Sequence, residues 1–196
     1  IDNSITGKLS AGDTITANGN VANQGSVRTN GSFNISGNFT NYNEILTGGD
    51  LTSKDILNSG TLKVSEKITG RGIFTNTGEI LTSNLDIDTA GNIINTNKIT
   101  VVETSKLKGS SNINNQGTIA SKNIEITTPV LTNSGQILAE EVITANNTSL
   151  TNTGKLASNG SINLNNTSIV NRSSIESTIV NLQNVFSYDN NTGIIR

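Results

Sequence analysis

The chain has 196 residues, of which 32% are hydrophobic and only 14% charged, and its net charge is -2. So little charge argues against ordinary disorder, and so few apolar residues argue against a thick layered core. Because His and Cys are absent, His-based triads, most zinc sites, disulfides and thiolate chemistry are excluded. Scattered Lys and Arg with few aromatics argue against nucleic-acid binding. No apolar run is long enough to predict membrane insertion.

A pattern of apolar–x–Asn–x–Gly–x–apolar recurs along the chain. It begins with a partial copy at Gly7 and Leu9, which places Ile5 at the asparagine position. Ten copies follow, from Val21 to Ile194, and six of them match at every position. In the other four copies, another residue replaces the glycine: Asn43, Asn97, Ser173 and Thr192.

The asparagines of these copies, here called anchor asparagines, are spaced by 17 to 20 residues, with a mean of (190 − 23)/9, about 18.6. Such self-similarity is typical of a solenoid, in which each repeat contacts only its neighbours. We expect the anchor asparagines to stack in one column and to bond amide to amide from coil to coil, because buried amides need partners. They are Asn23, Asn41, Asn58, Asn76, Asn95, Asn115, Asn133, Asn152, Asn171 and Asn190.

The pattern also predicts a bend at each anchor asparagine. Residues two apart on a strand share one face, so the two apolar residues, the asparagine and the glycine do not fit one flat strand with an apolar core. A bend between two strands near the asparagine resolves this conflict. Gly, or the Asn43 and Asn97 that replace it, then favours a left-handed backbone conformation at the bend.

A second apolar segment follows each anchor by about 9 to 12 residues. The one Pro, Pro129, is expected at a corner, because Pro removes a ladder donor from a strand. Pairs in the second segment are Phe33 with Ile35, Leu85 with Ile87, Ile124 with Ile126, and Ile162 with Leu164; single members are Ile15, Leu51, Ile68 and Leu107.

These features predict an all-β chain: a right-handed, single-stranded parallel β-helix of about ten coils, each of about 18–19 residues. The competing solenoid is the left-handed hexapeptide helix. That fold needs an aliphatic residue at every sixth position, and this chain lacks the six-residue register.

The repeat resembles the shaft repeats of filamentous haemagglutinin-type exoproteins, including contact-dependent inhibition proteins, which are the secreted partners of two-partner secretion. The segments Asn133-Ser134-Gly135-Gln136-Ile137-Leu138-Ala139 and Asn115-Gln116-Gly117-Thr118-Ile119-Ala120 carry the likeness most clearly, and it extends from Gly7 to Ile194. The resemblance implies a rod-like adhesin, in some members presenting a C-terminal toxin. Neither the family's N-terminal secretion motif nor a toxin-like segment is present, so residues 1–196 are interpreted as one internal segment of a longer shaft.

Few residues suggest chemistry. Asp86 and Asp88 flank Ile87 on one strand face and suggest either a calcium or lyase-like cleft or, more simply, outward-facing carboxylates. Glu140 and Glu141 are adjacent and fit a solvated corner. Gly48-Gly49-Asp50-Leu51 is similar to a calcium-binding nonapeptide, but it occurs once and that motif works in tandem.

The expected function is structural, with no catalytic, cofactor or metal site. The chain is predicted to be a shaft of a secreted or cell-surface bacterial exoprotein, with an outer-membrane secretion partner for the whole protein and a host-cell or neighbouring-cell receptor as a further partner. The alternative is a carbohydrate-acting β-helix enzyme. Sparse carboxylates, the absence of His and the lack of long corner loops favour the shaft.

Overall fold

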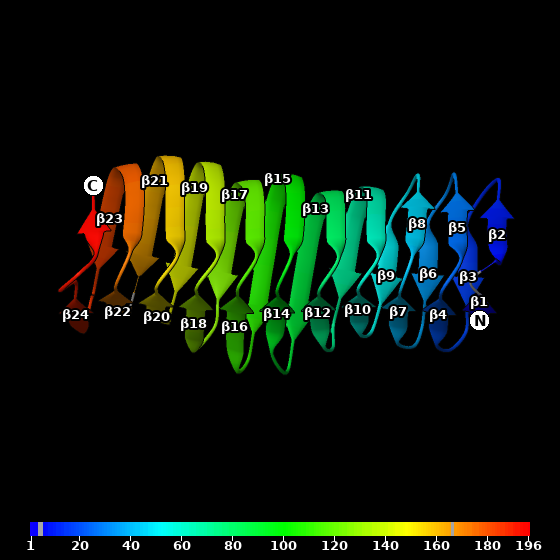
Figure 1. Ribbon diagram of the computed structural model, residues 1–196, viewed down its shortest axis with the longest axis horizontal. Helices are drawn as coiled ribbons and strands as arrows, with labels where there is room; N and C mark the ends of the chain where they lie inside the picture. Colours follow the sequence, from blue (N-terminus) through cyan, green and yellow to red (C-terminus); the bar gives the residue numbers. More distant parts are fainter. Residues whose placement is uncertain (4–5, 166) are drawn as a thin grey trace.

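The chain folds into a straight rod of stacked coils. The computed structural model describes residues 1–3, 6–165 and 167–196, and every regular element in these residues is a β-strand. Neighbouring strands run parallel, and the N- and C-termini lie at opposite ends of the rod (Figure 1). The predicted parallel β-helix of about ten coils is therefore confirmed.

Each coil has three sides, here called faces A, B and C. Face A is an eleven-stranded sheet in which all strands but the last end at an asparagine. Its strands are β1 (Asp2–Asn3), β4 (Val21–Asn23), β7 (Phe39–Asn41), β10 (Ile56–Asn58), β12 (Phe74–Asn76), β14 (Ile93–Asn95), β16 (Asn112–Asn115), β18 (Val130–Asn133), β20 (Ser149–Asn152), β22 (Ser168–Asn171) and β24 (Ser187–Asp189).

Faces B and C form one fourteen-stranded sheet that bends at a corner. Near the N-terminus, face B holds β2 (Lys8–Ala11), β5 (Ser26–Thr29) and β8 (Glu44–Thr47), and face C holds β3 (Ile15–Ala17), β6 (Phe33–Ile35) and β9 (Leu51–Ser53). Later coils join both faces in one long bent strand. These are β11 (Thr61–Gly70), β13 (Glu79–Thr89), β15 (Lys98–Gly109), β17 (Thr118–Thr127), β19 (Gln136–Asn146), β21 (Lys155–Asn165) and β23 (Ser174–Gln183); β25 (Ile194–Ile195) ends face B.

Along each strand, successive side chains point alternately into the core and out to solvent, as the two-residue period of a β-strand requires. On face B, Leu62 pairs in register with Ile80, Ile80 with Ile99, and Ile99 with Ile119, and all four are 0–1% exposed. The second apolar segments of the sequence, from Ile15 to Leu164, point inward on face C and are buried as predicted. Each coil is thin, so one apolar side chain or two from each face fills it.

The long strands bend at an irregularity in their register. In β11 the pairing with β13 shifts between Val64 and Lys67, and in β15 the pairing with β17 shifts between Val101 and Thr104. The residues at the shift face outward, as extra residues at a bulge do. Pro129 lies at another corner, between β17 and β18, as the sequence predicts.

The two terminal copies of the repeat are corrected. Asn3, not Ile5, pairs in register with Asn23, and Ile5 itself lies outside the described residues. At the other end, Ile195 rather than Ile194 pairs with Ile175, so the last corner contains one residue more than the pattern assumes. Insertions at corners displaced both terminal copies from the position that constant spacing predicts.

Candidate functional site

The anchor asparagines form a continuous hydrogen-bonded ladder along one corner of the rod, between faces A and B. The Nδ2 atom of Asn95 donates to Oδ1 of Asn115 at 2.8 Å, and Nδ2 of Asn115 donates to Oδ1 of Asn133 at 2.8 Å. All ten predicted anchors take part, and Asn3 adds a further member at 2.8 Å from Asn23. Every donor points toward the C-terminal end.

The anchor amides from Asn23 to Asn171 also donate to a backbone carbonyl oxygen of the next coil, and most of them donate to one in their own corner as well. Nδ2 of Asn115 donates to the carbonyl oxygen of Gly117 in its own corner at 3.1 Å and to that of Gln136 in the next coil at 3.0 Å. The anchors from Asn23 to Asn171 are 0–2% exposed, whereas Asn190 in the last coil is partly exposed. Buried amides that bond in this way satisfy the carbonyls of the bend, so the ladder closes the corner that the sequence predicts.

The corner glycines have a different role from the predicted one. Among the described residues, positive φ angles occur only at Gly19, Asn147 and Asn184, so the corner glycines do not adopt a left-handed conformation. They allow close packing of coils instead. A Cβ atom at Gly117 would lie 1.9 Å from the carbonyl oxygen of Asn97 in the preceding coil, and one at Gly135 would lie 2.0 Å from that of Gly117.

The close packing at glycine shortens a backbone hydrogen bond between coils, as comparison with the corners without glycine shows. The amide that follows Gly117, on Thr118, donates to the preceding coil at 2.7 Å, and the one that follows Gly135 does so at 2.8 Å. The corresponding bonds after Asn43, Asn97 and Ser173 are 3.3–3.4 Å long. In the last coil Gly193, not Thr192, occupies the corner, and Ile194 donates at 2.7 Å. A side chain at this position therefore loosens the bond between coils.

Ser and Thr hydroxyl groups donate to backbone carbonyl oxygens at the other two corners. The sequence analysis did not identify these hydroxyl groups. Between faces B and C, the Thr82 hydroxyl donates to the carbonyl oxygens of Glu66 and Asn84, each at 3.0 Å, and the Ser121 hydroxyl to those of Glu103 and Asn123 at 3.1 and 2.9 Å. Between faces C and A, the Thr148 hydroxyl donates to the carbonyl oxygen of Thr128 at 3.0 Å. A buried Ser or Thr recurs at these corners, as at Thr29, Thr47, Thr82, Ser121 and Ser158, although Val64, Val101 and Ala139 take its place in three coils; this recurrence is the signal that was available.

One buried hydroxyl lacks such a partner. Ser105 is 0% exposed, stands in register between Leu85 and Ile124 in the core column of face C, and its Oγ has no hydrogen-bond partner among the described residues. We expect Ser105→Ala to raise the free energy of unfolding by about 1 kcal/mol, because it removes a desolvated hydroxyl that makes no bond. Urea unfolding followed by circular dichroism measures the change.

Ser121→Ala is the matched control, because that buried serine makes two hydrogen bonds. It should lower the free energy of unfolding by about 1 kcal/mol. Equal losses in the two variants would mean that the Ser105 hydroxyl has a partner in solution.

The Asp86 and Asp88 pair points outward, and Ile87 between them is buried. Asp86 receives two hydrogen bonds from the Arg71 guanidinium at 3.0 and 3.2 Å and lies 3.5 Å from the Lys67 ammonium; Asp88 pairs with Lys108 at 3.0 Å. Each carboxylate is neutralised by a cation of an adjacent coil, so the pair ties coils together and does not converge on a shared ligand.

The Arg71 hydrogen bonds hold the pKa of Asp86 below its usual range, helped by the charges of Arg71 and Lys67 and opposed by partial burial. A lowered carboxyl pKa stabilises the fold at pH values above the unfolded-state pKa of about 3.9, and this contribution is lost as the pH falls through the lower folded-state value. We expect Asp86→Asn to lower stability by about 0.5–1 kcal/mol at pH 7 and by progressively less below pH 4. Thermal melts from pH 2 to pH 7 test this, and a difference independent of pH would contradict it.

The remaining candidates also lie on the outside of the rod. Glu140 and Glu141 are both exposed at the corner between faces B and C, where the Glu141 carboxylate lies 3.6 Å from the Lys122 ammonium. Gly48 and Gly49 form the turn between β8 and β9. Within the described residues, no group of three or more acidic side chains is placed to hold a metal ion, and no helix is long and apolar enough to cross a membrane.

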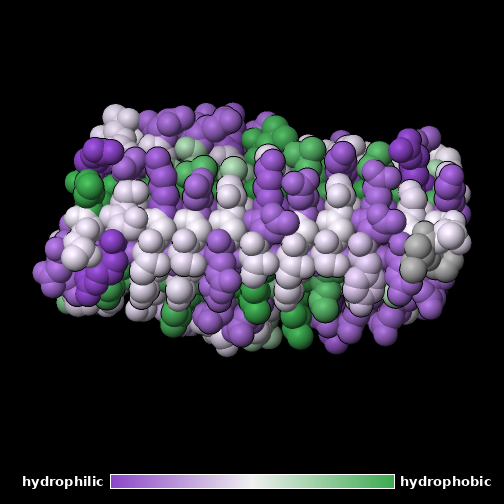
Figure 2. Space-filling model, viewed as in Figure 1, coloured by the Kyte–Doolittle hydropathy of each residue, from purple (hydrophilic) through white to green (hydrophobic). Residues whose placement is uncertain are grey.

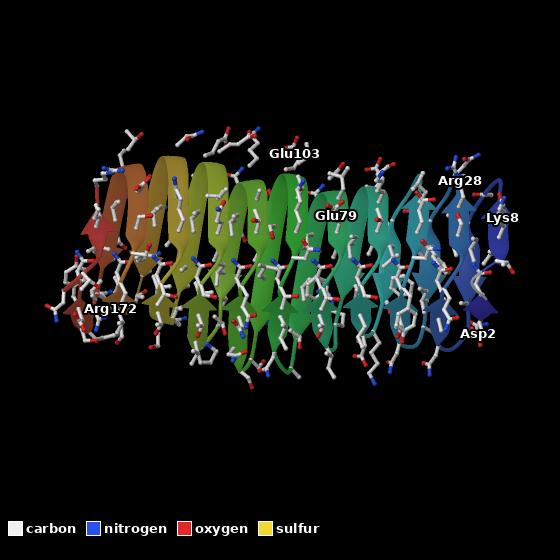
Figure 3. All side chains as sticks on the ribbon, in the orientation of Figure 1. Asp2, Lys8, Arg28, Glu79, Glu103 and Arg172 are labelled. Carbon is white, nitrogen blue, oxygen red and sulfur yellow. The ribbon has the colours of Figure 1, made fainter. Side chains whose placement is uncertain are left out.

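The side-chain view shows the same distribution: ionisable groups such as Lys8, Arg28, Glu79, Glu103 and Arg172 are spread along the whole rod and do not gather in one place (Figure 3). No protein-family model, curated protein or solved structure matches the chain. The likeness to filamentous haemagglutinin-type repeats therefore rests on the residues of the repeat.

Proposed function

We propose that this chain is a stiff structural shaft of a large secreted bacterial exoprotein, an adhesin or a contact-dependent inhibition protein, that holds a distal binding or toxin region away from the cell surface. The observation that carries the proposal is the asparagine ladder, which joins every coil to the next through the same set of bonds. A rod whose coils are linked identically resists bending and is extended by adding coils.

The sequence resemblance supports the secreted, cell-surface location and the outer-membrane secretion partner of this proposal. The solenoid is compatible with a shaft, and its polar groups are used for bonding between coils. A receptor contact on this segment would be weak and spread over the surface, because the labelled ionisable groups are distributed along the whole rod (Figure 3).

Deleting or duplicating one coil in register tests the shaft. Removing residues 116–133 joins Asn115 to Ser134 and takes out one repeat of 18 residues. We expect the rod to shorten by about 4.8 Å, measured by small-angle X-ray scattering, with little change in melting temperature, and a longer parent protein to keep its secretion and the activity of its distal region. Loss of secretion or distal activity in a variant that still folds would contradict the proposal.

The enzyme alternative is tested separately. The purified chain is incubated with neutral and acidic polysaccharides, with and without calcium, and reducing ends and unsaturated products are measured. We expect no turnover. Turnover that disappears in an Asp86→Asn, Asp88→Asn double variant would replace the shaft with a carbohydrate-acting enzyme.

A further inference from the structure

Face B carries an apolar surface that no other part of the described chain covers. Its second outward row lies at the third residue of each strand from β5 to β23, and the apolar members of this row are Leu46, Leu81, Ala120, Leu138 and Ala157. Leu81 is 44% exposed, and Val102, at the neighbouring corner, is 56% exposed. Hydrophobic surface appears at the middle of the upper edge in Figure 2, where Figure 3 labels Glu103, the residue after Val102.

This face is hollowed along the rod. One hollow of about 540 Å³ is lined by Leu46, Leu81 and Val102 among others, and a second of about 330 Å³ is lined by Ala120, Leu138 and Ala157. The larger side chains therefore lie toward the N-terminal half of the face, and the smaller ones lie toward the C-terminal half.

The charges on face B are distributed in the same asymmetric way. In the first outward row, formed by the first residue of each strand, Glu44 and Glu79 lie in the N-terminal half, Lys98 lies at the centre and Lys155 lies in the C-terminal half. The second row begins with Arg28 and ends with Glu176. Each row therefore has opposite charges toward its two ends.

We propose that face B binds a second copy of this chain, with the two rods antiparallel. The two-fold axis runs along the strand direction through the coil of β15, so that Thr100 faces Thr100 of the other copy. Counting face-B strands from β5 as coil 1 to β23 as coil 9, coil n faces coil 10 − n. This rotation places the first outward row of one copy against the first outward row of the other, and the second row against the second.

The antiparallel arrangement sets opposite charges against each other toward the ends of the face and large apolar side chains against small ones, while Lys63 in coil 3 faces Leu138 in coil 7. Glu44 in coil 2 faces Lys155 in coil 8 of the other copy, and Arg28 in coil 1 faces Glu176 in coil 9. Leu46 and Leu81 face Ala157 and Ala120, so large side chains fill the second hollow. At the centre, Lys98 of one copy faces Lys98 of the other. Each Lys98 has Glu79 of its own copy in the neighbouring coil on one side and Glu79 of the other copy on the opposite side, at a coil spacing of about 4.8 Å.

The size of the face sets the strength of binding. Nine coils of about 4.8 Å and strands of four residues of about 3.3 Å give a surface of about 43 by 13 Å, which is about 1,100 Å² buried in total. That area is at the low end for a specific interface, so we expect a dimer with a micromolar dissociation constant that weakens as salt is added.

Charge reversal tests the arrangement. Sedimentation velocity of the purified chain should show a monomer–dimer equilibrium. Glu44→Lys and Lys155→Glu, made singly, should each raise the dissociation constant at least about 10-fold, because each sets like charges opposite each other twice per dimer. The double variant should restore dimerisation. Lys54→Glu, an exposed reversal at the corner between faces C and A, is the control and should leave the dimer unchanged.

Cross-linking provides a second, independent measurement, because the chain contains no Cys. Thr100→Cys should form a disulfide-linked dimer under glutathione-disulfide oxidation, whereas Thr75→Cys, an outward threonine at the centre of face A, should not. Thermal melts confirm that each variant is folded. A chain that stays monomeric at high micromolar concentration, a double variant that fails to dimerise, or association that gives long oligomers without a Thr100→Cys cross-link would overturn the proposal.

Discussion

Replacing Asn115 by Asp should lower the free energy of unfolding at pH 7 by about 3 kcal/mol or more, the largest effect we expect from a change of so few atoms. The Asn115 amide nitrogen faces three oxygen acceptors, on Asn133, Gly117 and Gln136, and is 0% exposed. A carboxylate there would place charge against these oxygens without a cation nearby, and burial of an uncompensated charge is strongly unfavourable.

The same change should make stability depend on pH. Burial and the facing oxygens would raise the carboxyl pKa of the Asn115→Asp variant, so its folded state would bind a proton that the unfolded state has lost at neutral pH. Stability of this variant is therefore expected to rise as the pH falls toward the unfolded-state value of about 4. Urea unfolding at pH 4.5 and pH 7.5 measures the difference.

Asn114→Asp is the matched control, because Asn114 is the preceding residue on β16 and faces outward. It should change stability by no more than about 0.5 kcal/mol. Asn115→Ala separates charge from lost bonding, and we expect a loss of about 2–3 kcal/mol, since it leaves the Oδ1 of Asn133 and two carbonyl oxygens without their donor. If Asn114→Asp and Asn115→Asp unfolded at the same urea concentration, the ladder would have no energetic importance.

The fold and the ladder could be predicted from the sequence because both depend on short, periodic features. An anchor asparagine such as Asn76 is flanked by Phe74 and Ile80, and the step to Asn95 is almost constant, so the stacking direction and register follow. Period-two apolar pairs such as Leu85 and Ile87 identify the inward side of face C in the same way.

Features that depend on contacts between coils could not be read from one repeat. The glycine position was identified, but its cause was assigned to the local backbone, whereas the actual constraint is a carbonyl oxygen about 18 residues away. The ion pairs of Asp86 with Arg71 and Lys67 were also missed, because two coils of different length must be placed in register before these residues are neighbours. Corner insertions caused the two terminal errors at Ile5 and Ile194.

The corner glycines provide the second large effect. We expect Gly117→Ala to lower the free energy of unfolding by about 2–3 kcal/mol, the range seen when an extra methyl group is forced into a packed interior. The added Cβ would lie 1.9 Å from the carbonyl oxygen and 2.6 Å from the amide nitrogen of Asn97, so the two coils must separate. Thermal or urea unfolding measures the change.

The effect is limited because the chain already contains corners that have adjusted to a side chain. At Asn97 the following amide, on Lys98, still bonds to the preceding coil, but at 3.3 Å rather than the 2.7 Å found after Gly117. The Gly117→Ala variant should therefore fold, with the amide proton of Thr118 exchanging faster with solvent because its bond to Asn97 is longer.

Gly91→Ala is the control for this prediction. A Cβ at Gly91 would meet no atom closer than the Thr89 hydroxyl at 3.7 Å, and its φ is not in the left-handed region. Replacing this glycine by alanine should leave stability unchanged or raise it by up to about 1 kcal/mol, since alanine has less backbone freedom to lose on folding. If both variants lost the same stability, glycine would be required at the corners for backbone flexibility, whereas a loss confined to Gly117→Ala would show that the distance between coils is the constraint.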